Sequence, residues 1–267
     1  STPLYSSAAS DVYKRQLLFS DKWKHKMTIK LVDGIITNSK SIKNAYNQFS
    51  WMNKNKTTVI YNGLGLKKNI KPLDIKTIWN IPKNHVVFVA AGRLVPQKGF
   101  DLLIDAANRL KKSARPFTLL IAGMGKDRKS LQEKIVLNKL SNVKLIGFQN
   151  NLPPILKASD YVIMPSRQEG MPNVVMESMA LGKSVLAAKV NGVSELMDHN
   201  RTGYIFDPMK VKPILDAMNF VLDNHGSEKI INWGLLAKDH IKNNFRLDKM
   251  IDHLESYFYD QYAQSYR

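Results

Sequence analysis

The sequence predicts an α/β fold in which a doubly wound parallel sheet carries helices on both faces. Short, continuous apolar runs alternate with longer segments whose apolar residues recur at helical spacing. Continuous apolar strands are typical of parallel sheets, because both faces of each strand are buried. The 267 residues are 44% hydrophobic, which is enough to bury the core of one large or two modest domains.

The first predicted elements form a short unit upstream of the main domain. Residues 31–37 predict a strand, 39–49 a helix, and 57–61 a second strand that ends in the turn Asn62-Gly63. Two strands and one helix are too few to be stable alone. We therefore expect this unit to be part of a larger structure.

The main domain begins with an apolar strand at residues 85–91, which the loop containing Gly92 and Arg93 follows. Residues 100–112 then place five apolar side chains on one face of a helix. Further strands are predicted at residues 117–122, 143–146, 161–164, 184–187 and 204–206. Further helices are predicted at residues 126–140, 173–181, 211–222, 228–242 and 247–264.

The predicted elements divide the chain into four segments. Residues 1–16 have neither the apolar core of a signal peptide nor helical periodicity, and they look like translated sequencing adapter. We expect them to be a non-native, unstructured leader, with the true reading frame beginning upstream of Leu17. The other segments are the short unit at 17–66, the ligand-binding domain at 67–242 and a terminal helix at 243–267.

Composition excludes several classes of protein. The absence of cysteine excludes disulfides and thiol nucleophiles and suits a cytoplasmic location. No apolar run approaches the roughly 18 residues that span a bilayer. The formal charge of +18 has three interpretations: coding bias toward Lys, Asn and Ile, attraction to an anionic membrane or phosphorylated acceptor, and nucleic-acid binding. Nucleic acid is the weakest of the three, because its sequence signatures are missing.

Three charged residues follow predicted strands where parallel sheets bind ligands, and a fourth lies in the next helix. Arg93 and Lys98 follow the strand at 85–91, and Glu169 follows the strand at 161–164. The carboxyl ends of parallel strands meet at one edge, so these side chains are expected to converge. Glu177 is the only charge in an apolar helix, where a buried carboxylate needs hydroxyls or cations as partners.

The stretch between the two glutamates adds a helix amino terminus to this edge. The loop Gly170-Met171-Pro172-Asn173 presents backbone N–H groups, although Pro172 removes one donor. With two cations, this arrangement predicts a phosphate or diphosphate site. Each cation alone is more often a solvated loop charge. The turn at 123–125 lacks the third glycine of a dinucleotide fingerprint, which favours a helix-capping turn.

Three motifs resemble those of the retaining group 1 (family 4) glycosyltransferases of GT-B fold. They are Gly-Arg-Leu-Val-Pro-Gln-Lys-Gly at 92–99, Glu169 and Glu177 with seven residues between them, and Asn-Gly-Val-Ser-Glu at 191–195. The resemblance covers residues 31–258. It implies that 67–242 is a Rossmann-like donor-binding domain and that 17–66 is the remnant of an amino-terminal acceptor domain. The terminal helix at 243–267 would cross back to that remnant.

The resemblance also implies roles for individual residues. Arg93 and Lys98 would neutralise the departing diphosphate, Glu169 would hold hydroxyls of the sugar, and Glu177 would accept hydrogen bonds from the ribose. The implied catalytic residues are Arg93, Lys98 and Glu169. The implied donor-binding residues are Gly92, Phe148, Gly170, Met171, Pro172, Asn173, Val174 and Glu177. Glu195 either belongs to the site or only caps or pairs beside its short helix.

The implied reaction transfers a sugar from a nucleotide sugar, best matched by a UDP-sugar, to a polysaccharide or lipid-linked acceptor with retention of configuration. No metal or other cofactor is expected, because neither an Asp-x-Asp motif nor a close His/Asp cluster occurs. The basic cluster at 22–26 and Lys67-Lys68 are candidates for contact with an anionic membrane at its inner face. Exposed basic loops are the competing interpretation.

Two other functions compete with this one. The same motifs would suit a non-catalytic nucleotide-sugar binding module. A nicotinamide-dependent enzyme is disfavoured, because the third glycine is missing and the two cations lie on a different loop. Since fewer than fifty residues of the acceptor domain are recognisable, we expect this chain to bind nucleotide sugar weakly and not to turn over. Its full-length parent would be an active transferase.

Overall fold

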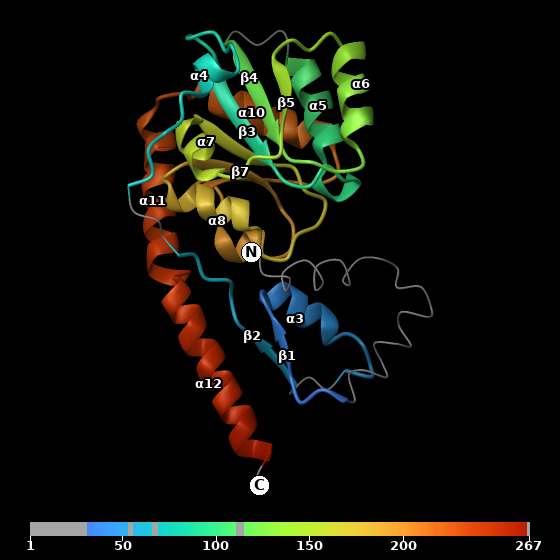
Figure 1. The fold of residues 1–267 in the computed structure, drawn as a ribbon, viewed down its shortest axis with the longest axis vertical. Helices are drawn as coiled ribbons and strands as arrows, with labels where there is room; N and C mark the ends of the chain where they lie inside the picture. Colours follow the sequence, from blue (N-terminus) through green and yellow to red (C-terminus); the bar gives the residue numbers. More distant parts are fainter. Residues whose placement is uncertain (1–30, 53–55, 66–68, 111–114, 266–267) are drawn as a thin grey trace.

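A computed structural model describes residues 31–52, 56–65, 69–110 and 115–265. This part of the chain forms a six-stranded parallel sheet and a smaller two-stranded parallel sheet, which confirms the predicted α/β class (Figure 1). The predicted leader at 1–16, the basic cluster at 22–26 and Lys67-Lys68 lie outside the described residues. No helix in the described ranges is long and apolar enough to cross a membrane.

The six-stranded sheet is wound in two directions from its centre. Its order is β5-β4-β3-β6-β7-β8, and every neighbouring pair is parallel. The strands are β3 (Val86–Ala91), β4 (Phe117–Ala122), β5 (Val143–Gly147), β6 (Tyr161–Met164), β7 (Ser184–Ala188) and β8 (Gly203–Phe206). The chain moves outward from β3 to β5, returns to the centre at β6, and moves outward again to β8. A ligand crevice is expected between β3 and β6, where the direction reverses.

Helices cover both faces of this sheet. On one face, α5 (Phe100–Arg109) packs against α6 (Arg128–Leu137) and α10 (Val211–Asp223). On the other, α8 (Asn173–Ala180) packs against α7 (Pro153–Ala158) and α11 (Glu228–Asn244). The four inner strands, β4, β3, β6 and β7, are buried on both faces, as their apolar runs predict, whereas the edge strands β5 and β8 are partly exposed.

Several boundaries differ from the predicted ones for local reasons. The helix predicted at 126–140 ends at Leu137, because Lys139 adopts a left-handed conformation with φ of 52° that a helix cannot continue. The short helices α4 (Ile75–Ile78), α9 (Val193–Leu196) and the 3-10 turn η3 (Pro96–Lys98) are too brief to show a period in the sequence.

One close crossing fixes α11 against the end of α8. Gly182 follows α8, and Gly234 lies within α11. A Cβ atom added to Gly234 would come within 2.2 Å of the carbonyl oxygen of Gly182, so only glycine fits. This contact sets how closely α11 approaches the wall that α8 forms.

The amino-terminal unit contains β1 (Ile35–Thr37), α3 (Lys40–Tyr46) and β2 (Thr57–Val59). The strands pair in parallel and are shorter than predicted, and Ser39 is the N-cap of α3, accepting from the backbone N–H of Ile42. The terminal helix α12 (Leu247–Ser265) leaves the main domain and runs beside this unit (Figure 1). A Cβ on Gly34 would come within 1.7 Å of the Tyr257 hydroxyl oxygen of α12.

Candidate functional site

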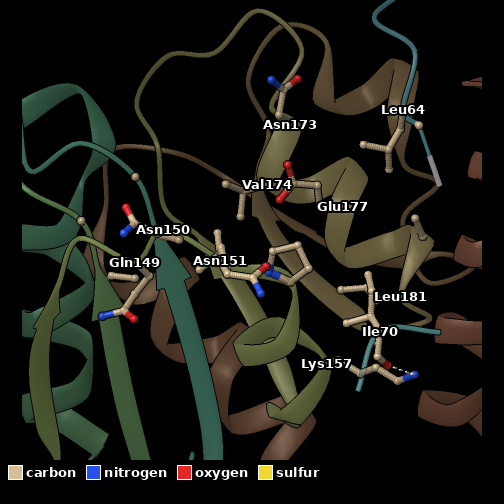
Figure 2. A pocket seen from close by; sticks show the side chains of 18 of the residues that line it. Leu64, Ile70, Gln149, Asn150, Asn151, Lys157, Asn173, Val174, Glu177 and Leu181 are labelled. Carbon is tan, nitrogen blue, oxygen red and sulfur yellow. Dashed lines mark hydrogen bonds between the residues drawn. The ribbon is translucent and has the colours of Figure 1, made fainter. Parts of the chain in front are cut away.

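A cleft of about 1050 Å³ opens at the carboxyl ends of the central strands (Figure 2). Its walls include the loops after β3, β4 and β5 and the exposed side of α8. A smaller pocket of about 200 Å³ adjoins it, and Arg93, Asn173 and Val174 line both spaces. Lys98 and Glu169 line the smaller pocket, whereas Glu177 lines the larger one. The structure therefore brings the four charged residues singled out in the sequence to one region.

The carboxylate of Glu169 is held by two neighbours. The Nζ atom of Lys98 lies 2.6 Å from Oε1 of Glu169, and the hydroxyl of Ser166 donates to the same oxygen over 2.6 Å. Glu169 is only 7% exposed, so these partners offset much of the cost of burying its charge. Within the described part of the chain, both hydrogen bonds use Oε1, which leaves Oε2 available to accept from a ligand.

An ion pair fixes the loop that carries Glu169. The Nη atoms of Arg167 donate to both carboxylate oxygens of Asp101 in α5, over 2.8 and 2.7 Å. Burial alone would raise the pKa of Asp101, but the hydrogen bond and charge of Arg167 outweigh it and lower that pKa. The backbone N–H of Arg167 also donates to the carbonyl of Gln97 over 2.8 Å. These bonds join the loop after β6 to the turn that carries Lys98.

Two glycines permit the close approach of these loops. Gly99 has a left-handed φ of 69°, and a Cβ there would come within 2.1 Å of the carbonyl oxygen of Pro165. A Cβ on Gly123 would come within 1.8 Å of the carbonyl oxygen of Gly92. The expected capping role of the 123–125 turn needs correction, because its glycine allows contact with a neighbouring loop and the N-cap of α6 is Asp127.

Glu177 projects from α8 into the larger cleft (Figure 2). The opposite side of the helix is buried through Val175, Met176 and Met179. The sequence led us to expect a buried carboxylate, but Glu177 is half-buried, because one side of α8 forms the wall of an open cleft. Figure 2 shows Asn173 before it and Leu181 after it along the same wall.

The amino terminus of α8 faces the smaller pocket. Pro172 is its N-cap, and the carbonyl of Pro172 accepts from the N–H groups of Val175 and Met176 over 3.1 and 3.2 Å. The loop Gly170-Met171-Pro172-Asn173 lines the pocket, as does Val174. The earlier N–H groups of the helix thus lie beside Arg93 and Lys98, where a helix favours negative charge.

Two exposed apolar side chains lie at the cleft. Phe148 follows β5 and is 61% exposed, and Met124 follows β4 and is 57% exposed. A single large apolar side chain on a protein surface is common, but these two line the same concave space, together with Gly92. They offer a face for a flat apolar ligand group.

Sequence reasoning missed one set of residues that line the larger cleft. Leu64 and Ile70 come from the segment that joins the two units, whereas Lys238 and Lys242 come from α11. Lys157 donates to the carbonyl of Ile70 over 2.8 Å and so fixes the position of Ile70 (Figure 2). These residues lie far apart in the chain and form no motif, so only the tertiary fold brings them together.

Glu195 lines neither pocket. It is half-buried and accepts hydrogen bonds from the backbone N–H groups of Lys40 and Ser41 at the start of α3, over 2.8 and 2.9 Å. The hydroxyl groups of Ser41 and Tyr61 also donate to it, over 3.0 and 2.9 Å. Burial, then the hydrogen bond and charge of Glu195, raise the pKa of Tyr61 to about 12. Of the two interpretations of Glu195, this geometry favours a capping contact, made to a distant helix.

Comparisons with known proteins give a consistent result. The chain is 28% identical over 214 residues to the UDP-Gal:alpha-D-GlcNAc-diphosphoundecaprenol alpha-1,3-galactosyltransferase of Escherichia coli, covering 77% of this chain and 54% of that protein. The solved structure of Anabaena HepE in complex with UDP-glucose is 25% identical with a TM-score of 0.75, covering 88% of this chain and 68% of that one. Sucrose-phosphate synthase of Thermosynechococcus elongatus reaches a TM-score of 0.80 at 20% identity, covering 92% and 62%, which shows the fold alone.

The chain spans about half the length of the curated relatives that it matches first. It has the GT-B fold and covers mainly the carboxy-terminal Rossmann-like domain of that fold. The family described as "Glycosyl transferases group 1" matches residues 73–234, which is more than half of the chain and includes Arg93, Lys98, Glu169 and Glu177. The chain therefore belongs to the group 1 glycosyltransferases.

Proposed function

We propose that this chain binds the nucleotide-sugar donor of a retaining glycosyltransferase. The observation that carries the proposal is the meeting of Arg93, Lys98, Glu169 and Glu177 around two adjoining pockets at the point where the sheet reverses direction. A UDP-sugar is the proposed donor, because the galactosyltransferase relative is named for UDP-Gal and HepE was solved with UDP-glucose.

The diphosphate would lie where the two pockets meet. Arg93 lines both of them, and the amino terminus of α8 adds N–H groups and the positive end of its dipole. As the bond between sugar and diphosphate breaks, negative charge builds up on the departing oxygen. Arg93, Lys98 and these N–H groups would stabilise that charge without a metal ion.

Glu169 would hold the sugar in the smaller pocket. Its Oε1 is taken by Lys98 and Ser166, so Oε2 is proposed to accept a sugar hydroxyl. The ion pair would then position Lys98 beside the diphosphate as well as neutralise Glu169. A sugar fixed in this way would reach the oxocarbenium-like state with its leaving group already aligned toward the cations.

The nucleoside would occupy the larger cleft. Glu177 is proposed to accept hydrogen bonds from both ribose hydroxyls, which suits a half-buried carboxylate on an otherwise apolar helix. Phe148, with Met124 nearby, would contact the base. Gly92 would allow the diphosphate to approach the backbone after β3.

The acceptor is proposed to be a glycan or a lipid-linked saccharide. The galactosyltransferase relative is named for an acceptor linked to diphosphoundecaprenol, which supports the lipid-linked choice. Such an acceptor would place the protein at the inner face of the membrane in the cytoplasm, with its excess of basic residues favouring anionic lipid. Turnover is proposed to need acceptor-binding residues beyond those of this chain.

Calorimetry with UDP tests the donor site directly on this chain. Glu177→Ala should weaken UDP binding about tenfold or more, because hydrogen bonds to a charged group contribute about 1.5–3 kcal/mol. Glu133→Ala is the matched control, since Glu133 is an exposed glutamate on α6 that lines neither pocket, and the substitution should leave binding unchanged.

The remaining outcomes separate the competing functions. Failure of the wild-type chain to bind UDP, together with tight binding of NAD, would favour a nicotinamide-dependent enzyme. UDP binding without sugar transfer by a full-length parent protein supplied with UDP-sugar and lipid-linked acceptor would favour a non-catalytic binding module. Transfer by this chain alone would contradict the need for further acceptor-binding residues.

A further inference from the structure

One carboxylate joins the amino-terminal unit to the main domain. Glu195 belongs to α9 after β7, and the four groups that donate to it within the described residues lie in the amino-terminal unit or at its junction with the main domain. Two of these donors are backbone N–H groups at the start of α3, where negative charge is favoured. Hydrogen bonds to an ionised acceptor are about twice as strong as neutral ones.

The turn that begins α9, at Gly192, contacts the loop proposed to hold the donor sugar. We call this loop, residues 169–173, the donor loop. The backbone N–H of Gly192 donates to the carbonyl of Gly170 over 2.9 Å. A Cβ added to Gly192 would come within 2.1 Å of that oxygen and within 3.3 Å of the Ser39 Cβ. Gly192 is therefore packed between the donor loop and the residue that caps α3.

The donor loop touches the amino-terminal unit directly as well. A Cβ on Gly170 would come within 2.9 Å of Oδ1 of Asn38 and 3.1 Å of Cδ1 of Ile42. The side-chain amide of Asn62 lies 3.5 Å from the carbonyl oxygen of Met171, a long hydrogen bond. The donor loop thus has the main domain on one side and α3 with the junction on the other.

We propose that Glu195 is a positioning residue, which clamps α3 and Tyr61 against the main domain and so holds the donor loop, with Glu169, in place for the sugar. The proposal rests on the proposed function for the role of the donor loop. Glu195 acts through Gly192 and Gly170 and does not itself touch the donor. Without its charge, the start of α3 and the Tyr61 hydroxyl lose their shared acceptor and the donor loop loses one wall.

The chemistry predicts a selective effect on binding. Glu169 and the donor loop would contact the sugar and the near side of the diphosphate, whereas Glu177 and Phe148 would contact the nucleoside. Glu195→Ala should therefore weaken binding of UDP-glucose about tenfold while changing that of UDP less than twofold. If Glu195 served only to stabilise α3, Glu195→Ala would lower the melting temperature and leave the ratio of the two affinities unchanged.

The experiment measures both affinities by calorimetry for the wild-type chain, Glu195→Ala, Glu195→Gln and Asp198→Asn. Asp198 is the matched control, because it is an exposed carboxylate near Glu195 in the chain that forms an ion pair with Arg201. Glu195→Gln keeps the shape but lacks the charge, so an intermediate loss of UDP-glucose affinity is expected. Equal losses for both ligands, or none in Glu195→Ala, would overturn the proposal.

Hydrogen exchange keeps the inference testable even if neither nucleotide binds. The Gly192 amide reports the contact with the donor loop, and it should exchange at least fivefold faster in Glu195→Ala but not in Asp198→Asn. Unchanged exchange would overturn the proposal whatever the nucleotide result. Absence of UDP binding by the wild type, with faster exchange in Glu195→Ala, would instead count against the proposed function alone.

Discussion

Gly99 illustrates how a single residue can fix the geometry of the proposed catalytic loops. It ends the turn that carries Lys98, and its left-handed φ of 69° places its Cα against the carbonyl of Pro165. A side chain at this position would separate the turn after β3 from the loop after β6. Lys98 and Glu169 lie on opposite sides of this contact, so their ion pair depends on it.

Gly99→Ala should destabilise the protein by about 2 kcal/mol or more, from left-handed strain together with the contact of 2.1 Å to the Pro165 oxygen. Gly226→Ala is the control, because Gly226 has a similar φ of 79° but nothing within 4 Å of an added Cβ. It should cost only the strain, about 1 kcal/mol. Urea denaturation measures both variants, and equal losses would show that the contact is unimportant.

At the scale of single residues, the sequence predicts the position of some cleft residues but not of others, for an identifiable reason. Arg93, Lys98 and Glu169 follow strands, and strand order alone sends them to one edge of the sheet. Lys238 reaches the cleft only because α11 packs against α8, and no local pattern encodes that contact. The partners of Glu195 could not be predicted from the sequence either, since Ser41 precedes it by 154 residues.

Among the elements, α11 depends on one contact that cannot be predicted from its sequence. Gly234 lies within this helix, where glycine ordinarily weakens a helix relative to alanine. Glycine is nevertheless required at this position, because α11 passes directly over the carbonyl of Gly182. The same crossing brings Lys238 and Lys242 to the wall of the larger cleft.

Gly234→Ala should destabilise the protein by about 1–3 kcal/mol, because an added Cβ would come within 2.2 Å of the Gly182 oxygen. Helix propensity alone predicts the opposite sign, a gain of about 1 kcal/mol. Thermal unfolding decides between them. Leu235→Ala, on the exposed side of the same helix, is the control and should change stability by less than about 0.5 kcal/mol.

Element types were more predictable than their ends. The inner strands of the main sheet, such as β3 and β4, were predictable because each is a continuous apolar run that is buried on both faces. Ends depend on caps and single backbone conformations, such as the left-handed Lys139 that closes α6. The strands β1 and β2 are shorter than predicted, because within the described residues they pair over only three positions, from Ile35 with Thr57 to Thr37 with Val59.

For the molecule as a whole, α12 brings the carboxy-terminal end of the described chain into contact with its amino-terminal unit. It continues from α11, passes the junction, where the backbone N–H of Gly63 lies 3.0 Å from the sulfur of Met250, and reaches Gly34 with Tyr257 (Figure 1). The sequence predicted a helix at 247–264, and the family resemblance implied that it crosses back to the amino-terminal remnant, but no pattern in the sequence indicated which residues meet there. Its apolar and polar residues are mixed, so no single face stands out.

Tyr257→Ala should loosen the amino-terminal unit without affecting the main sheet. Amides of 31–37 are expected to exchange faster with solvent, because the tyrosine ring that packs against Gly34 is gone. Phe258→Ala is the control on the adjacent position, since Phe258 is 61% exposed. Hydrogen exchange with mass spectrometry distinguishes the two, and equal protection of 31–37 in both variants would contradict the assigned contact.

The path of α12 also has a consequence for biosynthesis. Tyr257 leaves the ribosome 223 residues after Gly34, which it covers. During translation, β1 and β2 must therefore wait for the whole six-stranded domain to be made before their contact with α12 can form. A chaperone that shields those two strands would act during this interval.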